Sequence, residues 1–187
     1  MHDSNRLQRL QQTPLWDFAR LFYARPKVEE ACLALQDAAG IDVCELLFHC
    51  WLYRHGLQAE PAALAEERNT RLRWQREVTA ILRQLRRDLK PQAVECESIA
   101  ALRNTIQQAE LQAEHENLQR WEAWALQATK INQRLTKIVI SSQEVARWLQ
   151  DTLLYSAFDA CTVSEQRLPE STTRAFEVLA RQLDRFE

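Results

Sequence analysis

The residue types that could do chemistry crowd into one short segment, residues 26–56, which holds three of the five cysteines and two of the four histidines. Zinc sites place ligands two to four residues apart on a turn, or histidines at i and i+4 on a helix. The spacings here match neither pattern: twelve residues from Cys32 to Cys44, six to Cys50 and five more to His55. Free cysteine packs as a small apolar residue. We therefore expect buried thiols, no metal, no catalytic residue and no cofactor.

A narrow polar strip is formed by Glu45, His49 and Tyr53, which follow one another at i, i+4 and i+8. Side chains four residues apart on a helix can interact, and a carboxylate raises the basicity of a neighbouring imidazole. One interpretation is a ligand-binding pocket with a titrating group; the other is a strip that faces water. Two earlier polar residues, Gln36 and Asp37, either extend this patch or belong to ordinary helix surface.

A basic segment at residues 65–90 carries eight basic and four acidic residues, whereas residues 91–122 carry two basic and six acidic ones. Seven of the eight basic residues are arginine, which suits bidentate recognition of carboxylates or phosphates. A straight helical projection places five of them within about 100° of one another: Arg73, Arg76, Arg83, Arg87 and Lys90. This face either pairs with the acidic segment of a neighbouring helix or docks an acidic partner, a phosphate or RNA.

Helices must position these groups. Only two glycines occur in 187 residues, and the helix formers alanine, leucine, glutamine, glutamate and arginine dominate. Apolar residues at spacings of three and four predict a single all-α domain, residues 1–187, with three parts. These are a compact three-helix N-terminal unit (14–56), a long antiparallel helix pair (61–129) and C-terminal helices (141–187). Residues 130–140 favour no particular structure.

Local signals predict where the helices begin and end. Gly40 is expected to end the second helix, and the D-x-x-E pattern of Asp42 and Glu45 to begin the third. Ser98 is expected to begin the second long helix, and a capping box at residues 141–144 the next one. On the first helix of the long pair, the residues expected to be buried are Trp74, Val78, Ile81, Leu85 and Leu89.

Composition and motifs narrow the function classes. A net charge of −2 gives no reason to expect nucleic acid as a partner. No apolar run approaches the roughly 20 residues of a membrane span, and no signal-peptide pattern is present. An odd cysteine count without paired spacing fits a reducing compartment, so we expect a cytoplasmic location. The motifs of P-loops, zinc proteases, serine hydrolases and diiron bundles are absent, which argues against an enzyme.

The stretch LWDFARLFYARPKVEEACLALQDAAGIDVCELLFHCW, residues 15–51, resembles the opening signature of a small uncharacterised proteobacterial family of helical proteins. Its outline is W-x-F, a tyrosine, then P-G-V-x-x-A-C-L-x-L-Q-D-x-x-G-x-D-V-N. Two positions differ: Lys27 stands where glycine is usual, and Cys44 where asparagine is usual. The resemblance implies a bacterial cytoplasmic helical protein and brings no known activity with it.

Two functions are therefore considered as hypotheses. The first is a non-enzymatic protein-interaction or adaptor module that docks a protein partner through the basic helix face, with a homodimer as a further form of association. The second is a helical protein that binds a small apolar or isoprenoid-like molecule, with Glu45 and His49 at the mouth of its pocket.

Overall fold

The computed structural model describes residues 3–128, 133–157 and 169–183, and the described residues form the all-α fold that the sequence predicts, with one two-stranded sheet added. The first helices are α1 (Asp3–Gln12), α2 (Leu15–Tyr23), α3 (Val28–Ala39) and α4 (Val43–Arg54). Strand β1 (Leu57–Ala59) precedes α5 (Pro61–Trp74), a π turn (Gln75–Thr79), α6 (Ala80–Asp88) and a 3-10 turn (Gln92–Val94). Then come α7 (Glu97–Leu126), β2 (Leu135–Lys137), a 3-10 turn (Ser142–Glu144), α8 (Val145–Ala157) and α9 (Glu170–Gln182).

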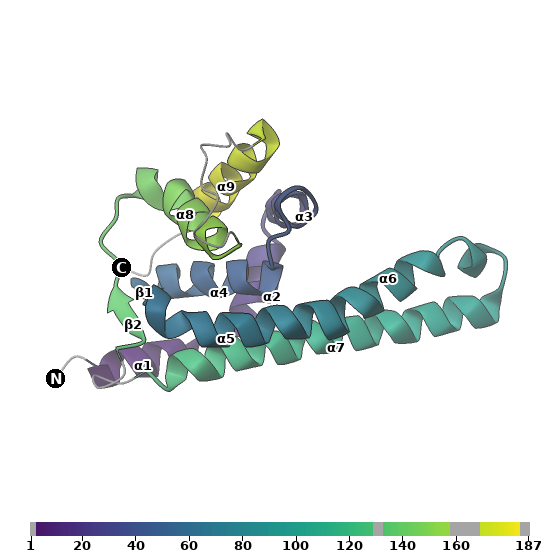
Figure 1. The fold of residues 1–187 in the computed structure, drawn as a ribbon, viewed down its shortest axis with the longest axis horizontal. Helices are drawn as coiled ribbons and strands as arrows, with labels where there is room; N and C mark the ends of the chain where they lie inside the picture. The colour runs from purple at the N-terminus through teal and green to yellow at the C-terminus, as the bar shows by residue number, and fades with distance from the viewer. Residues whose placement is uncertain (1–2, 129–132, 158–168, 184–187) are drawn as a thin grey trace.

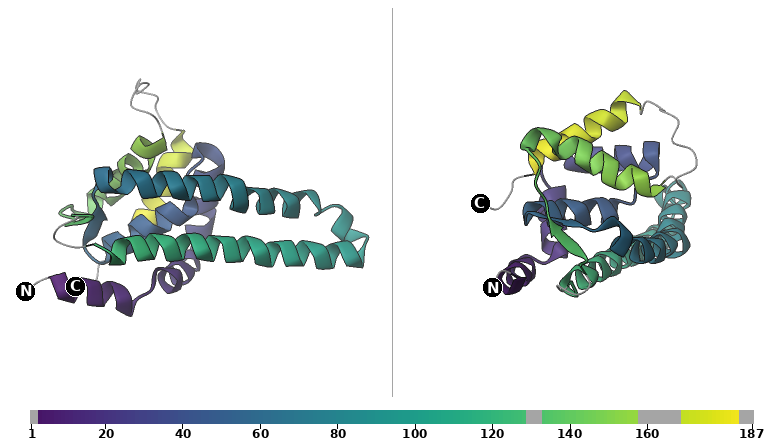
Figure 2. Two further views of the ribbon diagram at one scale, coloured as in Figure 1. Left: turned by 60° about the horizontal axis from the view of Figure 1, so that its bottom comes forward. Right: turned by 60° about the vertical axis from the view of Figure 1, so that its left-hand side comes forward.

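Helix α4 is the centre of the fold. Its residues from 44 to 53 are all buried, because α2, α3, α7 and α8 pack around it. In Figures 1 and 2, α8 and α9 lie on one side of α4 and α1 on the other. The indole N–H of Trp51 donates to the Thr13 carbonyl oxygen at 2.8 Å, which fixes α4 against the turn before α2. A helix that is apolar on nearly every face belongs in a core, and α4 occupies one.

Two predicted helix boundaries beside α4 are confirmed. Gly40 ends α3 with a φ of 65°, the left-handed conformation that glycine adopts most readily. Asp42 then caps α4, and its Oδ1 accepts a hydrogen bond from the Cys44 backbone N–H at 2.9 Å. The other predicted cap residue, Glu45, instead pairs with Arg68 of α5 and lies beside His49 of its own helix.

The long antiparallel helix pair is also confirmed. Helices α5 and α6, joined by the π turn, run against α7, and the α6 end projects beyond the rest of the molecule as an arm (Figure 1). Helix α7 begins at Glu97, and its cap residue is Cys96, two positions before Ser98, the predicted cap.

The predicted buried side of this pair is wrong at two positions. Ile81 and Leu85 are 53% and 46% exposed. The projection assumed one uninterrupted α-helix, but the π turn adds a residue to one turn, and each added residue rotates the later residues of the helix by about 100°. Arg83, only 15% exposed, consequently faces α7.

The C-terminal elements close the fold. Strand β2 pairs antiparallel with β1, Leu57 opposite Lys137, so part of the undetermined stretch 130–140 is a strand. The predicted capping box before α8 is confirmed: the Glu144 carboxylate accepts from the Ser141 backbone N–H at 2.8 Å. Helix α9 packs on α3 and α8. No described helix combines the length and the apolar character that a membrane span needs.

Candidate functional site

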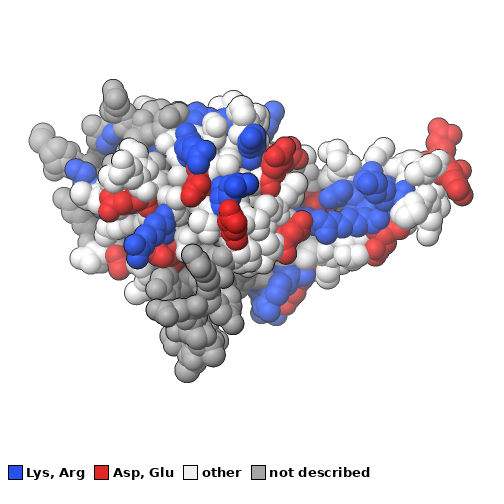
Figure 3. Space-filling view, turned by 90° about the horizontal axis from the view of Figure 1, so that it is seen from above, with Lys and Arg blue, Asp and Glu red and all other residues white. Residues whose placement is uncertain are grey.

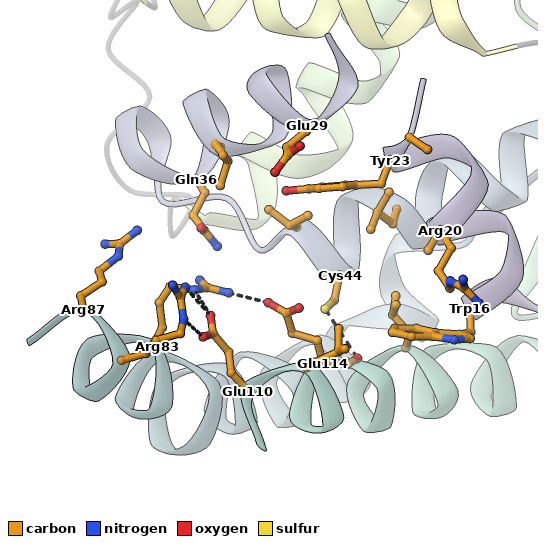
Figure 4. Close-up of a pocket in the computed structure, with 18 of the residues that line it drawn as sticks. Trp16, Arg20, Tyr23, Glu29, Gln36, Cys44, Arg83, Arg87, Glu110 and Glu114 are labelled. Carbon is orange, nitrogen blue, oxygen red and sulfur yellow. Dashed lines mark hydrogen bonds and ion pairs between the residues drawn. The ribbon is translucent and has the colours of Figure 1, made fainter. Parts of the chain in front are cut away.

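A groove of about 740 Å³ lies where the arm leaves the body, between α2, α3 and α4 on one side and α6 and α7 on the other. We call it the arginine groove. Figure 4 shows Tyr23 and Gln36 on one wall, and Arg83, Arg87 and Glu110 on the other. Apolar side chains form much of its lining: Trp16, Ala19, Leu33, Val43, Leu47 and Leu118.

The charged lining residues are unbalanced. Six are basic (Arg20, Arg83, Arg86, Arg87, Lys90, Arg103) and three are acidic (Glu29, Glu110, Glu114), an excess of three positive charges. Figure 3 shows basic side chains gathered along the arm. A mixed apolar and cationic lining suits a ligand that is itself both apolar and anionic.

Part of this charge is used inside the protein, in an ion-pair cluster of Arg83, Arg86, Glu110 and Glu114. Arg83 donates to Glu110 at 2.9 Å and to Glu114 at 2.6 Å, and Arg86 contacts the other oxygen of Glu110 at 2.5 Å. Burial acts to raise the pKa of Glu110, but the two guanidinium groups outweigh it and hold that pKa below its usual value. Glu110 is therefore ionised, and the cluster fastens α6 to α7 below the groove.

Three cations at the groove remain without such a partner. The side chains of Arg20, Arg87 and Lys90 form no hydrogen bond or ion pair with any described residue, although each lines the groove. Arg20 comes from α2, whereas Arg87 and Lys90 come from the end of α6 and the turn after it. In Figure 4, Arg20 and Arg87 lie at opposite ends of the groove with the ion-pair cluster between them.

The predicted basic face is divided by the structure. Arg83, Arg87 and Lys90 line the groove, together with Gln36 of the predicted polar patch. Arg73 and Arg76 are exposed and do not line it, and Arg73 instead pairs with Glu77 at 3.0 Å.

The rest of the predicted polar patch lies elsewhere. Asp37 is exposed and does not line the groove. Because Gln36 lines the groove and His49 lines a different hollow, the structure does not join Gln36 to the Glu45–His49 strip.

The strip of Glu45, His49 and Tyr53 does not face water: all three side chains are buried. The Glu45 carboxylate is 2.5 Å from Nε of Arg68 and 3.5 Å from Nε2 of His49. Burial acts to raise the pKa of Glu45, but His49 and Arg68 outweigh it and lower that pKa. Burial also lowers the pKa of His49 despite the nearby carboxylate. An ionised Glu45–Arg68 pair therefore lies beside a neutral imidazole.

Residues 14–121 match the family described as Protein of unknown function (DUF2390). The chain belongs to this family. Comparison with curated proteins finds no match, and neither does comparison with solved structures. Every residue that lines the arginine groove lies between 16 and 118, so the DUF2390 segment contains the whole lining. The His49 hollow also uses residues of α8, which lies beyond that segment.

Sequence reasoning did not single out several groove residues of the DUF2390 segment: Trp16, Arg20, Arg86, Arg103, Glu110 and Glu114. A signal for the last two was present. They stand at i and i+4 on the acidic half of a predicted antiparallel pair, where they share one face and can meet arginines of the basic half. The contribution of α2 had no such signal, because it depends on how the N-terminal unit docks against the arm.

The buried thiols, Cys32, Cys44 and Cys50, are confirmed as core residues. Burial raises the pKa of each, to about 12 for Cys32, so all three stay protonated near neutral pH. Among the residues that the structure describes, no cluster of histidine, cysteine or carboxylate side chains could hold a metal ion. The fifth cysteine, Cys161, lies outside the described residues.

Proposed function

We propose that this chain is a cytoplasmic protein-interaction module, without an enzymatic reaction of its own, that binds an acidic amphipathic helix of a partner protein in the arginine groove. One observation carries the proposal. The side chains of Arg20, Arg87 and Lys90 surround an apolar groove and have no partner among the described residues. Internal ion pairs satisfy Arg83 and Arg86, which leaves these three cations available to an external anion.

The arrangement of the cations favours an elongated ligand over a small anion. Arg20 and Arg87 lie at opposite ends of the groove, so a compact phosphate or carboxylate reaches only one of them (Figure 4). A helix that places glutamates or aspartates along one flank reaches both ends. Its apolar side chains, spaced by three and four residues, then pack on Trp16, Val43 and Leu47.

The experiment compares two charge reversals on the arm that change the net charge equally. The groove variant carries Arg87→Glu and Lys90→Glu; the matched control carries Arg73→Glu and Arg76→Glu, outside the groove. Peptides are first selected by the wild-type protein from a displayed library of its source proteome. Their affinities for all three proteins are then measured by fluorescence anisotropy.

We expect the selected peptides to combine apolar residues at helical spacing with carboxylates. The groove variant should bind them at least about tenfold more weakly, about 1.4 kcal/mol, whereas the control stays close to wild type. Rising salt should weaken wild-type binding, because exposed charges are screened. Equal losses in both variants, or no loss in the groove variant, would refute the groove as the binding site. A wild-type dimer that the groove variant alone dissociates would make the occupant a second copy of this chain.

A further inference from the structure

A second hollow, the His49 cleft, shares no lining residue with the arginine groove. It has a volume of about 400 Å³ and lies between α4, β1, α5 and α8. Its walls include His49, Gln58, Leu64, Arg68, Trp148 and Asp151. The elements come from two distant parts of the chain, residues 43–74 and α8, and Trp148 lies edge-on to His49, with ring centroids 6.2 Å apart.

The imidazole of His49 is the unusual feature of this cleft. It is 1% exposed; its Nδ1 has no hydrogen-bond partner, and its Nε2 has only the Glu45 carboxylate, at the long distance of 3.5 Å. Glu45 is nearby, but its carboxylate already holds Arg68. A neutral imidazole offers one N–H donor and one acceptor nitrogen. A buried polar group without a partner is rare in a folded protein and gains a hydrogen bond when a ligand supplies the missing group.

The charges around the cleft cancel in pairs. Arg68 is held by Glu45 at 2.5 Å, and its Nη2 also donates to the Thr152 carbonyl oxygen at 3.4 Å. Asp151, on the rim, is 3.8 Å from Arg147. No excess charge is therefore left to attract an ion. The walls from Leu64 and Trp148 instead offer apolar and aromatic surface.

We propose that the His49 cleft binds a small, uncharged, largely apolar molecule that carries one hydroxyl group, for which His49 is the hydrogen-bonding residue. The hydroxyl group meets a ring nitrogen of His49, and the apolar body packs between Leu64 and Trp148. Ligand pockets of this kind combine an apolar lining with a few polar groups that fix orientation. This site is independent of the proposed helix-binding groove, and neither proposal depends on the other.

The test uses three probes of similar shape: 4-methylphenol, toluene, which lacks the hydroxyl group, and 4-methylbenzoate, which is anionic. Each is titrated into the full chain, and binding is followed by backbone and indole N–H chemical shifts. His49→Phe removes both ring nitrogens and keeps a ring of similar size. His115→Phe is the matched control, because His115 packs against Trp16 outside the cleft, with ring centroids 4.3 Å apart.

We expect 4-methylphenol to shift the signals of the cleft, including the Trp148 indole, and to bind about fivefold more tightly than toluene, the effect of one net hydrogen bond. His49→Phe should abolish that difference, and His115→Phe should keep it. If His49→Phe does not fold, the ring nitrogen resonances of His49 in the wild-type chain decide: 4-methylphenol should move one of them and toluene neither. Absence of shifts in the cleft, equal binding of 4-methylphenol and toluene, or tighter binding of the anion would overturn the proposal.

Discussion

Replacing Asp42 by asparagine should make the protein more stable at high pH, although it removes a charged helix cap. Asp42 caps α4 and is 7% exposed, and its Oδ2 is buried without a hydrogen-bond partner. Burial raises its pKa from 3.8 to about 7, and the hydrogen bond from the Cys44 N–H offsets this only in part. The native state therefore keeps a proton on Asp42 that the unfolded chain releases near its ordinary pKa.

The sign and size of the effect come from proton linkage. Between about pH 4 and pH 7 the native state binds more protons than the unfolded state at this residue, so stability falls as pH rises through this window. A gap of roughly three pKa units corresponds to about 4 kcal/mol in total, of which about 3 kcal/mol lies between pH 5 and pH 8. Asparagine does not titrate, and its amide oxygen can still accept from the Cys44 N–H.

Urea unfolding of the wild type and of Asp42→Asn at pH 5 and pH 8 measures this difference. The stability of the variant relative to the wild type should grow by about 3 kcal/mol between the two pH values. Asp42→Ala serves as the control, because it removes both the titrating carboxyl group and the acceptor for the Cys44 N–H. Its free energy of unfolding should be about 1 kcal/mol lower than that of Asp42→Asn at both pH values. A stability difference between Asp42→Asn and the wild type that is the same at pH 5 and pH 8 would refute the buried, protonated aspartate.

Three further outcomes can be measured. Lys27→Gly should raise the free energy of urea unfolding by about 1 kcal/mol, because Lys27 has a φ of 64°, and Lys27→Ala should not. In a Cys161→Ser protein, Cys96 should react with a thiol reagent in the folded state, since Ser98 lowers the pKa of its half-buried thiol. The thiols of Cys32, Cys44 and Cys50 should react only when the protein unfolds. If they react in the folded protein as fast as Cys96, they are not buried. Glu110→Gln should lower the free energy of urea unfolding by about 2 kcal/mol, because it leaves Arg86 without its carboxylate partner. Glu116→Gln, which breaks the exposed pair with Arg120, should lower it by less than about 0.5 kcal/mol. Similar losses in the two variants would contradict a stabilising role for the ion-pair cluster.

Helix boundaries could be predicted because the responsible contacts are local. Asp42 caps α4 by accepting from the backbone N–H two residues later. The Glu144 carboxylate accepts from the Ser141 backbone N–H three residues earlier. The backbone before α3 is also set locally: Lys27 has a φ of 64°, a left-handed conformation that glycine adopts more readily. Such signals need no knowledge of the rest of the fold.

The surroundings of the polar strip could not be predicted in this way. Glu45 is buried because Arg68 reaches it from α5, and His49 because Trp148 covers it from α8. Both partners lie far along the chain, and on an isolated helix the strip is indistinguishable from solvated surface. Sequence periodicity reports which residues share a face, but not what covers that face.

The π turn exposes Ile81 and Leu85, which the sequence predicts to be buried, and it also determines which basic residues of the arm reach the arginine groove. In one straight helix the five basic residues share a single solvated face, and the arm offers a uniform cationic stripe. The added residue of the π turn separates Arg73 from the residues after it and directs Arg83 toward Glu110. Arg87 remains at the groove, where no described residue neutralises it. π turns often occur at functional sites because they redirect side chains. Here the redirection separates Arg73 and Arg76, which lie outside the groove, from Arg83, Arg87 and Lys90, which line it.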